Sequence, residues 1–320
     1  MKKFVYLLVL FFISCSNSLT GTEAYSFYEV GSYNTPGEAK AVYVSGEYAY
    51  VADGDSGLRI IDVSDPENPF EVGYYDTLGY FRDVFVDEDY ASVLHSYGLF
   101  VINVSNPSHP EKVGYYKVQD VYFNTLFVSG SYAYLTGYGS YGFALYIVDI
   151  SSPSHPYEAG RSDDYFYYCY DIYVSKGYCY SAGSMILKIT DVSHYDNPEE
   201  VGEWDAPDEV YGVHVVDNYA FLATGEEGIS IVDISDPRHP KGIGYCDVPG
   251  IAGSIFVKDD FAYLSIGGIG ICIIDVKTLS EPKVLGYCDT PGYAQDVFVS
   301  GDYAYVADGE GGLRIIMIEE

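Results

Sequence analysis

Three aspartates fall at matched positions of a segment that recurs along the chain: Asp83, Asp171 and Asp296. If these side chains converge, their carboxylates line one channel, and clustered carboxylates attract hard cations such as Ca²⁺. Alternatively, each aspartate accepts hydrogen bonds from neighbouring backbone N–H groups, because buried polar groups are normally paired. We assign no cofactor or metal ligand, and Ca²⁺ is the one ion that such a channel would favour. The other copies carry Ala41, Thr125, Gly212 and Ser254 at this position.

Aromatic residues gather just before these segments and in the loops beside them. Exposed tyrosine offers a broad, rigid contact area with a polar tip, which suits a glycan ring or a peptide. The alternative is that the rings pack one repeat against the next, as aromatic residues at strand ends often do. The candidate ligand-binding residues are Tyr80, Phe81, Tyr122, Phe123, Tyr138, Tyr141, Phe166, Tyr167, Tyr168, Tyr211 and Tyr293.

The histidines form no recognisable catalytic group. His109, His155 and His239 lie in the same turn of different copies, so we expect no shared metal site. Only His95 and His214 fall where they would reach the channel. No glycine-rich phosphate loop follows a strand and opens a helix. We assign no catalytic residue; the competing hypothesis is a metal-assisted hydrolase or lyase acting on carbohydrate, which would use the three aspartates with His95 or His214.

Five cysteines follow Cys15, and this odd number argues against a disulfide framework. Cys272 and Cys288 lie on the two sides of one turn, nearly opposite each other when counted outward from it. The sequence therefore permits a disulfide bond between them.

The matched positions belong to a repeated unit, whose clearest segment is LRIIDVSDP at Leu58–Pro66. A glycine marks the period in each of seven copies, at steps of 42, 41, 46, 42, 42 and 42 residues. One unit divides into four short strands separated by turn residues, and the aspartate that ends the third strand is expected to cap the following turn. The four predicted strands of the first unit are Ala41–Val44, Tyr48–Ala52, Leu58–Val63 and Glu71–Tyr75.

Four antiparallel strands in about 42 residues match one blade of a β-propeller. Seven copies therefore predict an all-β, seven-bladed propeller. The chain opens with a lone fourth strand at Phe27–Tyr33 and stops after a third strand at Leu313–Ile318. We expect the N-terminal strand to complete the last blade, so that no sheet edge is left open.

Three of the repeated segments, LRIIDVSDP, LYIVDISSP and ISIVDISDP, resemble the LVIVD repeat of exported bacterial and archaeal proteins, over roughly residues 27–318. Met317 and Asn103 depart from the aspartate that this pattern expects. The resemblance implies a propeller and an exported location, and it implies no defined reaction.

The net charge of −31, with 16 Lys and Arg against 47 acids, disfavours nucleic acid as a partner. Lys2 and Lys3 followed by the apolar Phe4–Ile13 are typical of an export signal. The run from Phe12 to Cys15 resembles a bacterial lipoprotein lipobox; an ordinary signal peptide cut nearby is the alternative. We predict a lipoprotein-type signal peptide at 1–14, a tether at 15–26 and the propeller at 27–320.

The leading functional hypothesis is a non-catalytic binding propeller for a protein, peptide or glycan. We expect it to be exported, held to the cell envelope by a lipid on Cys15, and facing the periplasm or the exterior. Contact with a membrane would occur only through this lipid. The alternatives are the enzyme described above and a purely structural module of a surface layer.

Overall fold

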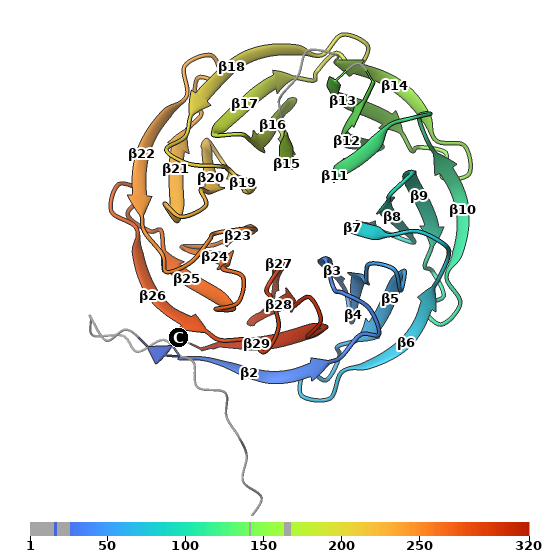
Figure 1. The fold of residues 1–320 in the computed structure, drawn as a ribbon, viewed down its shortest axis with the longest axis horizontal. Helices are drawn as coiled ribbons and strands as arrows, with labels where there is room; N and C mark the ends of the chain where they lie inside the picture. Colours follow the sequence, from blue (N-terminus) through green and yellow to red (C-terminus); the bar gives the residue numbers. More distant parts are fainter. Residues whose placement is uncertain (1–15, 18–25, 141, 163–167, 320) are drawn as a thin grey trace, which may run out of the picture.

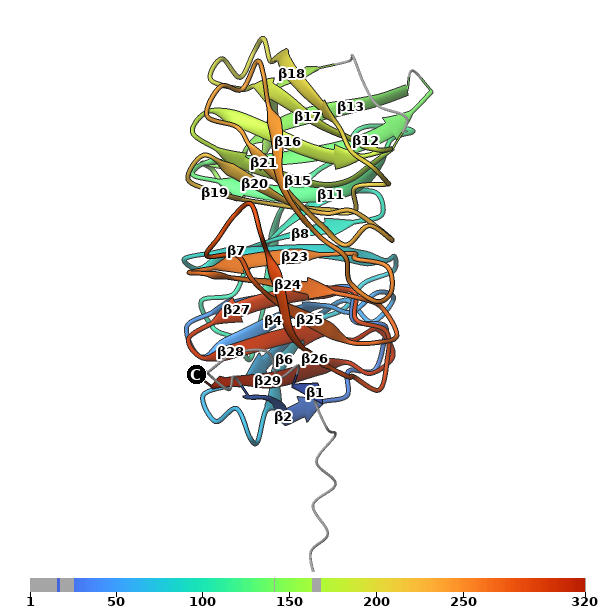
Figure 2. The ribbon, with the colours of Figure 1, turned by 90° about the vertical axis from the view of Figure 1, so that its left-hand side faces the viewer.

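The computed structural model describes residues 16–17, 26–140, 142–162 and 168–319. Within these ranges the chain forms 29 strands in seven sheets, which surround a common axis (Figure 1). Seen edge-on in Figure 2, the ring is a flat disc. The predicted seven-bladed β-propeller with four antiparallel strands per blade is confirmed. No helix long and apolar enough to span a membrane is found in the part of the chain that the structure describes.

The four strands of each blade follow the chain from the axis outward. Blades 1 to 3 comprise β3 (Ala41–Ser45), β4 (Tyr48–Ala52), β5 (Leu58–Asp62) and β6 (Phe70–Tyr75); β7 (Phe81–Asp87), β8 (Tyr90–His95), β9 (Gly98–Asn103) and β10 (Glu111–Tyr116); and β11 (Tyr122–Ser129), β12 (Tyr132–Gly139), β13 (Gly142–Asp149) and β14 (Tyr157–Ser162). Blades 4 and 5 comprise β15 (Cys169–Ser175), β16 (Tyr178–Gly183), β17 (Ile186–Asp191) and β18 (Glu199–Asp205); and β19 (Gly212–Val216), β20 (Tyr219–Ala223), β21 (Ile229–Asp233) and β22 (Lys241–Cys246). Blades 6 and 7 comprise β23 (Ile255–Lys258), β24 (Phe261–Ser265), β25 (Ile271–Asp275) and β26 (Lys283–Cys288); and β27 (Asp296–Ser300), β28 (Tyr303–Ala307), β29 (Leu313–Glu319) and the N-terminal β2 (Ser26–Tyr33).

The N-terminal strand closes the ring. β2 pairs antiparallel with β29, with Phe27 opposite Ile318 and Tyr33 opposite Leu313. The predicted closure of the last blade is therefore confirmed. A two-residue strand, β1 (Ser16–Asn17), lies in the segment predicted as a tether and pairs with β26, so blade 6 has a fifth strand.

The core lies between the blades. The two middle strands of a blade are buried on both faces; in β5, for example, every residue but the last is buried. Their apolar side chains pack against the neighbouring sheet, as Leu58 and Ile60 of blade 1 do against Phe81 and Val84 of blade 2. Each blade therefore depends on its neighbours for burial, and the closed ring supplies two neighbours to every blade.

The glycine that marks the repeat period permits close contact between blades. It lies in the outer strand beside a β-bulge, against the turn of the next blade. A Cβ atom on Gly73 would lie 2.1 Å from the carbonyl oxygen of Pro107, and one on Gly244 would lie 1.8 Å from that of Leu279. Any side chain at these positions would push two blades apart.

The aspartate at the end of the third strand caps the turn that follows, as the sequence predicts. In blade 1, Asp62 Oδ1 accepts hydrogen bonds from the backbone N–H of Ser64 at 2.9 Å and from its hydroxyl at 2.6 Å. The same pair recurs as Asp149 with Ser151, Asp191 with Ser193 and, in blade 2, Asn103 with Ser105.

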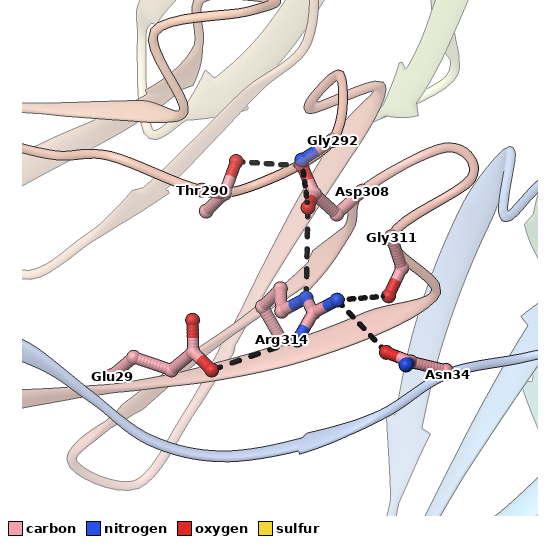
Figure 3. A network of polar contacts seen from close by, with 7 residues as sticks. All are labelled: Glu29, Asn34, Thr290, Gly292, Asp308, Gly311 and Arg314. Atoms are coloured by element: carbon pink, nitrogen blue, oxygen red, sulfur yellow. Dashed lines mark hydrogen bonds and ion pairs between the residues drawn. The ribbon is translucent and has the colours of Figure 1, made fainter. Parts of the chain in front are cut away.

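A cluster of polar residues joins the two ends of the chain (Figure 3). Asp308 is buried and accepts hydrogen bonds from the Thr290 hydroxyl at 2.6 Å and the Gly292 N–H at 2.8 Å. The guanidinium of Arg314 lies between two carboxylates: its Nε is 3.6 Å from Asp308 Oδ2, and its Nη1 is 3.7 Å from Oε1 of Glu29 on the N-terminal strand. We call Glu29, Thr290, Asp308 and Arg314 the closure cluster.

Blade 1 contains a second copy of this arrangement, built from Thr35, Asp53, Arg59 and Glu71. Burial raises the pKa of Asp53, as it raises that of Asp308. In blade 5, the positions that match this aspartate and this arginine hold Thr224 and Ser230, whose hydroxyl oxygens lie 3.1 Å apart. The ion-paired form therefore occurs in blade 7, which the N-terminal strand closes, and in the adjoining blade 1.

The disulfide that the sequence permits between Cys272 and Cys288 does not form, because the two side chains point to opposite faces of blade 6. A β-bulge shifts the register of β25 and β26, so that Cys272 pairs with Tyr287 and Cys288 pairs with Ile271. Neighbouring residues on a strand point to opposite faces. Cys272 is a free thiol in the core shared with blade 5, whereas Cys288 packs in the core shared with blade 7.

Candidate functional site

An axial cavity of about 660 Å³ is lined by the innermost strands of all seven blades. These strands, β3, β7, β11, β15, β19, β23 and β27, surround the centre of the ring in Figure 1. We call the end at which they begin the mouth face; it also carries the loops that join the second and third strands of the blades. Lys40, Arg82, Tyr170 and Tyr211 line the cavity at this end.

The three predicted channel aspartates line the cavity and join neighbouring blades. Asp171 accepts the N–H of Ile172 on its own strand and the N–H of Val213 on blade 5, both at 2.8 Å. Asp83 likewise accepts from Val84, at 2.8 Å, and from Leu126 on blade 3, at 3.1 Å. Every carboxylate therefore serves its own blade and the next one.

Asp296 connects three blades. Its oxygens accept the N–H of Val297 at 2.9 Å, the N–H of Val42 on blade 1 at 3.0 Å and the hydroxyl of Ser254 on blade 6 at 2.6 Å. Three aspartates thus serve all seven blades, which explains why the remaining copies of the position hold residues without a carboxylate. The carboxylate oxygens of the three aspartates therefore accept hydrogen bonds from the protein itself, which was the alternative to cation binding.

Burial governs the protonation of the channel. Burial, and next the charge of Asp296, raise the pKa of Asp83 to about 7. Burial also raises the pKa of Asp171 and of Asp296. It lowers the pKa of His214 to about 4, so this imidazole is neutral at physiological pH. Within the described residues, no group of three or more His, Cys, Asp or Glu side chains is placed to hold a metal ion.

A closed ring of seven aromatic side chains forms the inner end of the cavity, and we call it the collar. Each blade contributes one member, two residues beyond the matched position of the aspartates. Neighbouring ring centroids are 4.6 to 5.8 Å apart around the whole circle. The members are Tyr43, Phe85, Phe127, Tyr173, His214, Phe256 and Phe298.

The collar rings stand parallel to the axis of the propeller. Neighbouring planes are inclined by 44° to 59°. A seventh of a turn is about 51°, the inclination expected when sevenfold-related planes each contain the axial direction. The collar was not predicted, although a period of two along each inner strand gives the signal: the second residue after every matched position is aromatic or histidine.

At the mouth face, aromatic rings form a continuous arc over blades 3, 4 and 5. Successive ring centroids are 4.7 to 5.7 Å apart, and the first pair is stacked, with its planes inclined by 27°. We call this row the aromatic arc; its members, in order, are Tyr122, Tyr138, Phe143, Tyr168, Tyr170 and Tyr211.

The opposite side of the mouth is polar. The Tyr80 hydroxyl donates to Glu38 at 2.8 Å, and Glu38 pairs with Lys40. The guanidinium of Arg82 lies 5.2 Å from the centre of the Tyr80 ring. Arg82 is exposed, and it forms no ion pair with a residue that the structure describes.

The structure divides the predicted ligand-binding residues into three groups. Tyr122, Tyr138, Tyr168 and Tyr211 belong to the aromatic arc, and Tyr80 and Tyr293 also lie at the mouth face. Phe81 and Phe123 are buried in the core between blades, with exposed fractions of 0% and 1%, so their assignment as ligand contacts is wrong. Tyr141, Phe166 and Tyr167 lie outside the described residues, as does Cys15.

His95 does not reach the channel. It is buried, its ring stacks on Phe100 with centroids 4.6 Å apart, and its Nε2 lies 3.0 Å from the carbonyl oxygen of Leu78. Its Nδ1 accepts the Tyr97 N–H. His95 is therefore part of a blade interface, whereas His214 is a member of the collar.

Exposed apolar side chains are concentrated at the mouth face. Fourteen large hydrophobic side chains are exposed among the described residues, and four of them lie on outer strands: Phe70, Tyr74, Tyr157 and Tyr245. The other ten lie in mouth-face loops or at the adjoining strand ends: Leu78, Tyr97, Tyr122, Tyr138, Tyr168, Tyr170, Met185, Ile251, Ile269 and Tyr293.

Several solved structures are similar to this chain in fold. A chain of the mitotic checkpoint complex aligns with a TM-score of 0.76 and 12% identity, covering 91% of this chain and 92% of that chain. The RRP9 WD40 repeats align with a TM-score of 0.74 and 9% identity, covering 92% and 97%. The computationally designed Ika8 protein aligns with a TM-score of 0.67 and 7% identity, covering 90% and 99%. At these identities the likeness concerns the fold alone.

No curated protein matches the chain in sequence. The LVIVD repeat matches residues 36–77, 78–118, 123–164, 209–248, 249–290 and 291–318. The unmatched residues 165–208 include the strands of blade 4, whose β18 ends at Asp205. The matched segments cover well over half of the sequence, and the chain therefore belongs to the LVIVD repeat family.

Proposed function

We propose that this propeller is a binding module that holds a partner protein on its mouth face. The aromatic arc is the observation that carries the proposal. Soluble proteins rarely leave a continuous apolar patch exposed unless it marks an interaction site. Tyrosine is also among the residues enriched in protein interfaces.

The position of the arc also favours a partner protein. Among the described residues, the outer strands at the ring edge of the disc carry four exposed large apolar side chains, whereas the mouth face carries ten. The similar chain in the mitotic checkpoint complex belongs to a protein assembly, as its name states. The arc spans three blades, so a partner would contact a broad surface and the cavity would receive only a projecting part of it.

The chain is also proposed to be exported and anchored through a lipid on Cys15. Lys2, Lys3 and the apolar Phe4–Ile13 support this location. Cells that produce the full chain and a Cys15→Ser variant would be labelled with a palmitate analogue. The proposal expects the label on the parent protein alone and release of the variant into the soluble fraction; equal labelling of both proteins would overturn it.

Binding at the arc can be tested with peptides displayed from a random library and selected on the full chain. A Tyr122→Ser, Tyr138→Ser double variant should lose at least about tenfold in affinity for the selected peptides, because hot-spot tyrosines each contribute more than about 1 kcal/mol. A Tyr245→Ser variant is the control, because Tyr245 is 54% exposed on the outer strand β22.

The thermal unfolding of the double variant should match that of the parent. Peptide binding that survives the double substitution, or that falls equally in the control, would refute the proposal. A large loss of thermal stability would show that the rings are structural. A parallel screen on immobilised glycans provides the alternative outcome: sugar binding that depends on the arc, without peptide binding, would replace the partner protein by a glycan.

A further inference from the structure

The blade-5 end of the aromatic arc has an acidic residue beside its last two rings. Tyr170 and Tyr211 have centroids 4.7 Å apart and planes inclined by 52°. Burial, and next the charge of Glu209, raise the pKa of both tyrosines. The charge of Glu209, two residues before Tyr211 in the chain, therefore acts on both phenol groups. We call Tyr170, Glu209 and Tyr211 the acidic corner.

One carboxylate oxygen of the acidic corner lacks a partner. Oε2 of Glu209 is buried and has no hydrogen-bond donor in the described part of the chain. Glu209 also forms no ion pair with any lysine or arginine that the structure describes. Burying a charged oxygen without a partner is costly, and the arrival of a positive group would relieve that cost.

The two rings favour the same kind of group. The face of an aromatic ring attracts a cation by its quadrupole, and the attraction grows when the site is partly shielded from water. Two inclined tyrosines beside a carboxylate therefore combine two attractions for one positive charge. A neutral sugar would satisfy the rings and leave the charge of Glu209 unmatched.

The wider charge distribution supports the same ligand class. Asp208 and Glu226 add to the negative potential at Tyr211. The chain carries a net charge of −31, which steers positively charged partners toward it. The basic side chains at the mouth, Lys40 and Arg82, lie on blades 1 and 2, across the cavity from blade 5.

We propose that the acidic corner binds a lysine or arginine side chain of a basic segment of the partner protein. This inference rests on the proposed function, because it names the partner chemistry for one end of the same arc. The basic side chain lies against the two tyrosine rings and pairs with Glu209. The rest of the segment follows the arc toward Tyr138.

The test uses a fluorescent hexalysine peptide, its fully acetylated form, and the full chain at physiological ionic strength. Hexalysine should bind, and acetylation should abolish binding. Glu209→Gln and Tyr170→Leu should each weaken binding about tenfold, the scale of a partly desolvated cation–π contact or charge pair. The matched control is Glu227→Gln, which removes the same charge from the same blade; Glu227 is exposed and borders a separate depression with Trp204 and Tyr245.

Each outcome decides a different point. An equal loss for Glu209→Gln and Glu227→Gln would show non-specific attraction to an acidic surface and would overturn the inference, as would unchanged binding in both Glu209→Gln and Tyr170→Leu. If library-selected peptides still depend on Tyr122 and Tyr138 in those cases, the proposed function stands and only the partner chemistry fails. If selected peptides ignore the arc as well, both proposals fall.

Discussion

Replacing Asp83 with alanine should destabilise the propeller at the contact between blades 2 and 3. The carboxylate accepts the N–H of Val84 at 2.8 Å and that of Leu126 at 3.1 Å. Alanine leaves both donors without a protein acceptor. A buried donor left unsatisfied costs about 1–3 kcal/mol, hence about 2–6 kcal/mol for the pair. Because the axial cavity gives water access to this wall, we expect a loss of about 3 kcal/mol at pH 5.

The loss should shrink as the pH rises. Burial and the charge of Asp296 raise the pKa of Asp83 to about 7 in the folded protein. The folded state therefore binds more protons than the unfolded state between about pH 4 and pH 7, and this contribution to stability is lost as the pH rises through 7. A pKa difference of about three units between the folded and unfolded states corresponds to at most about 4 kcal/mol of pH-dependent stability. Because the Asp83 carboxyl borders the cavity, we expect about half of that value. The alanine variant lacks this dependence.

Urea unfolding at pH 5 and pH 8, followed by tyrosine fluorescence and circular dichroism, measures both effects. The control is Asp87→Ala, at the exposed end of the same strand. The variant should be clearly less stable than the control at pH 5, and the gap should narrow by pH 8. A variant within about 0.5 kcal/mol of the control at pH 5, the range of ordinary surface substitutions, would refute the reasoning. A gap that widens at pH 8 would refute the pKa argument.

Three further predictions concern the blades, the collar and the closure. Gly244→Ala should cost about 3 kcal/mol or more, because the new Cβ would lie 1.8 Å from a carbonyl oxygen of blade 6; Gly268→Ala, which meets no atom within 4 Å, should be nearly neutral in the same denaturation assay. The parent protein should lose stability as the pH falls from 7 to 4.5, because burial lowers the pKa of His214 to about 4 and only the unfolded state binds the extra proton in this range. The His214→Phe variant should not show this loss. Parallel pH profiles of the melting temperature for the two proteins would contradict the prediction. Arg314→Met should cost about 3–5 kcal/mol, because it leaves the carboxylates of the closure cluster without their positively charged partner. Lys277→Met, which removes an exposed ion pair with Asp260 at 4.0 Å, should change the urea midpoint little. Equal effects would show that the closure cluster contributes no more than a surface pair.

The architecture could be predicted from the sequence because each blade repeats the same local rules. The hydrophobic runs, the capped turn at Asp62 and the glycine period are all readable within one unit of about 42 residues. The closure by β2 followed from counting strands at both ends. Met317 and Asn103, which depart from the repeat, still occupy regular places in β29 and β9.

Contacts between blades were less accessible to sequence reasoning. The hydrogen-bond acceptor for Val213 comes from Asp171, 42 residues earlier, and nothing local to either residue shows the pairing. Phe81 was expected at the surface together with Tyr80, but Phe81 begins strand β7 and its ring is buried in the core between blades 1 and 2. Whether Cys272 and Cys288 are bonded was left open by the sequence, because one β-bulge decides it by placing Cys288 on the opposite face from Cys272.

The collar narrows the axial compartment at its inner end. With neighbouring centroids 4.6 to 5.8 Å apart, a regular heptagon places every ring centre roughly 5.6 Å from the axis, and the ring edges reduce the free passage further. A solute that enters at the mouth face and reaches this depth therefore meets aromatic side chains on every side. A bound segment that is longer than the axial cavity is deep would project past Lys40 and Tyr211, where it would contact a partner held on the mouth face.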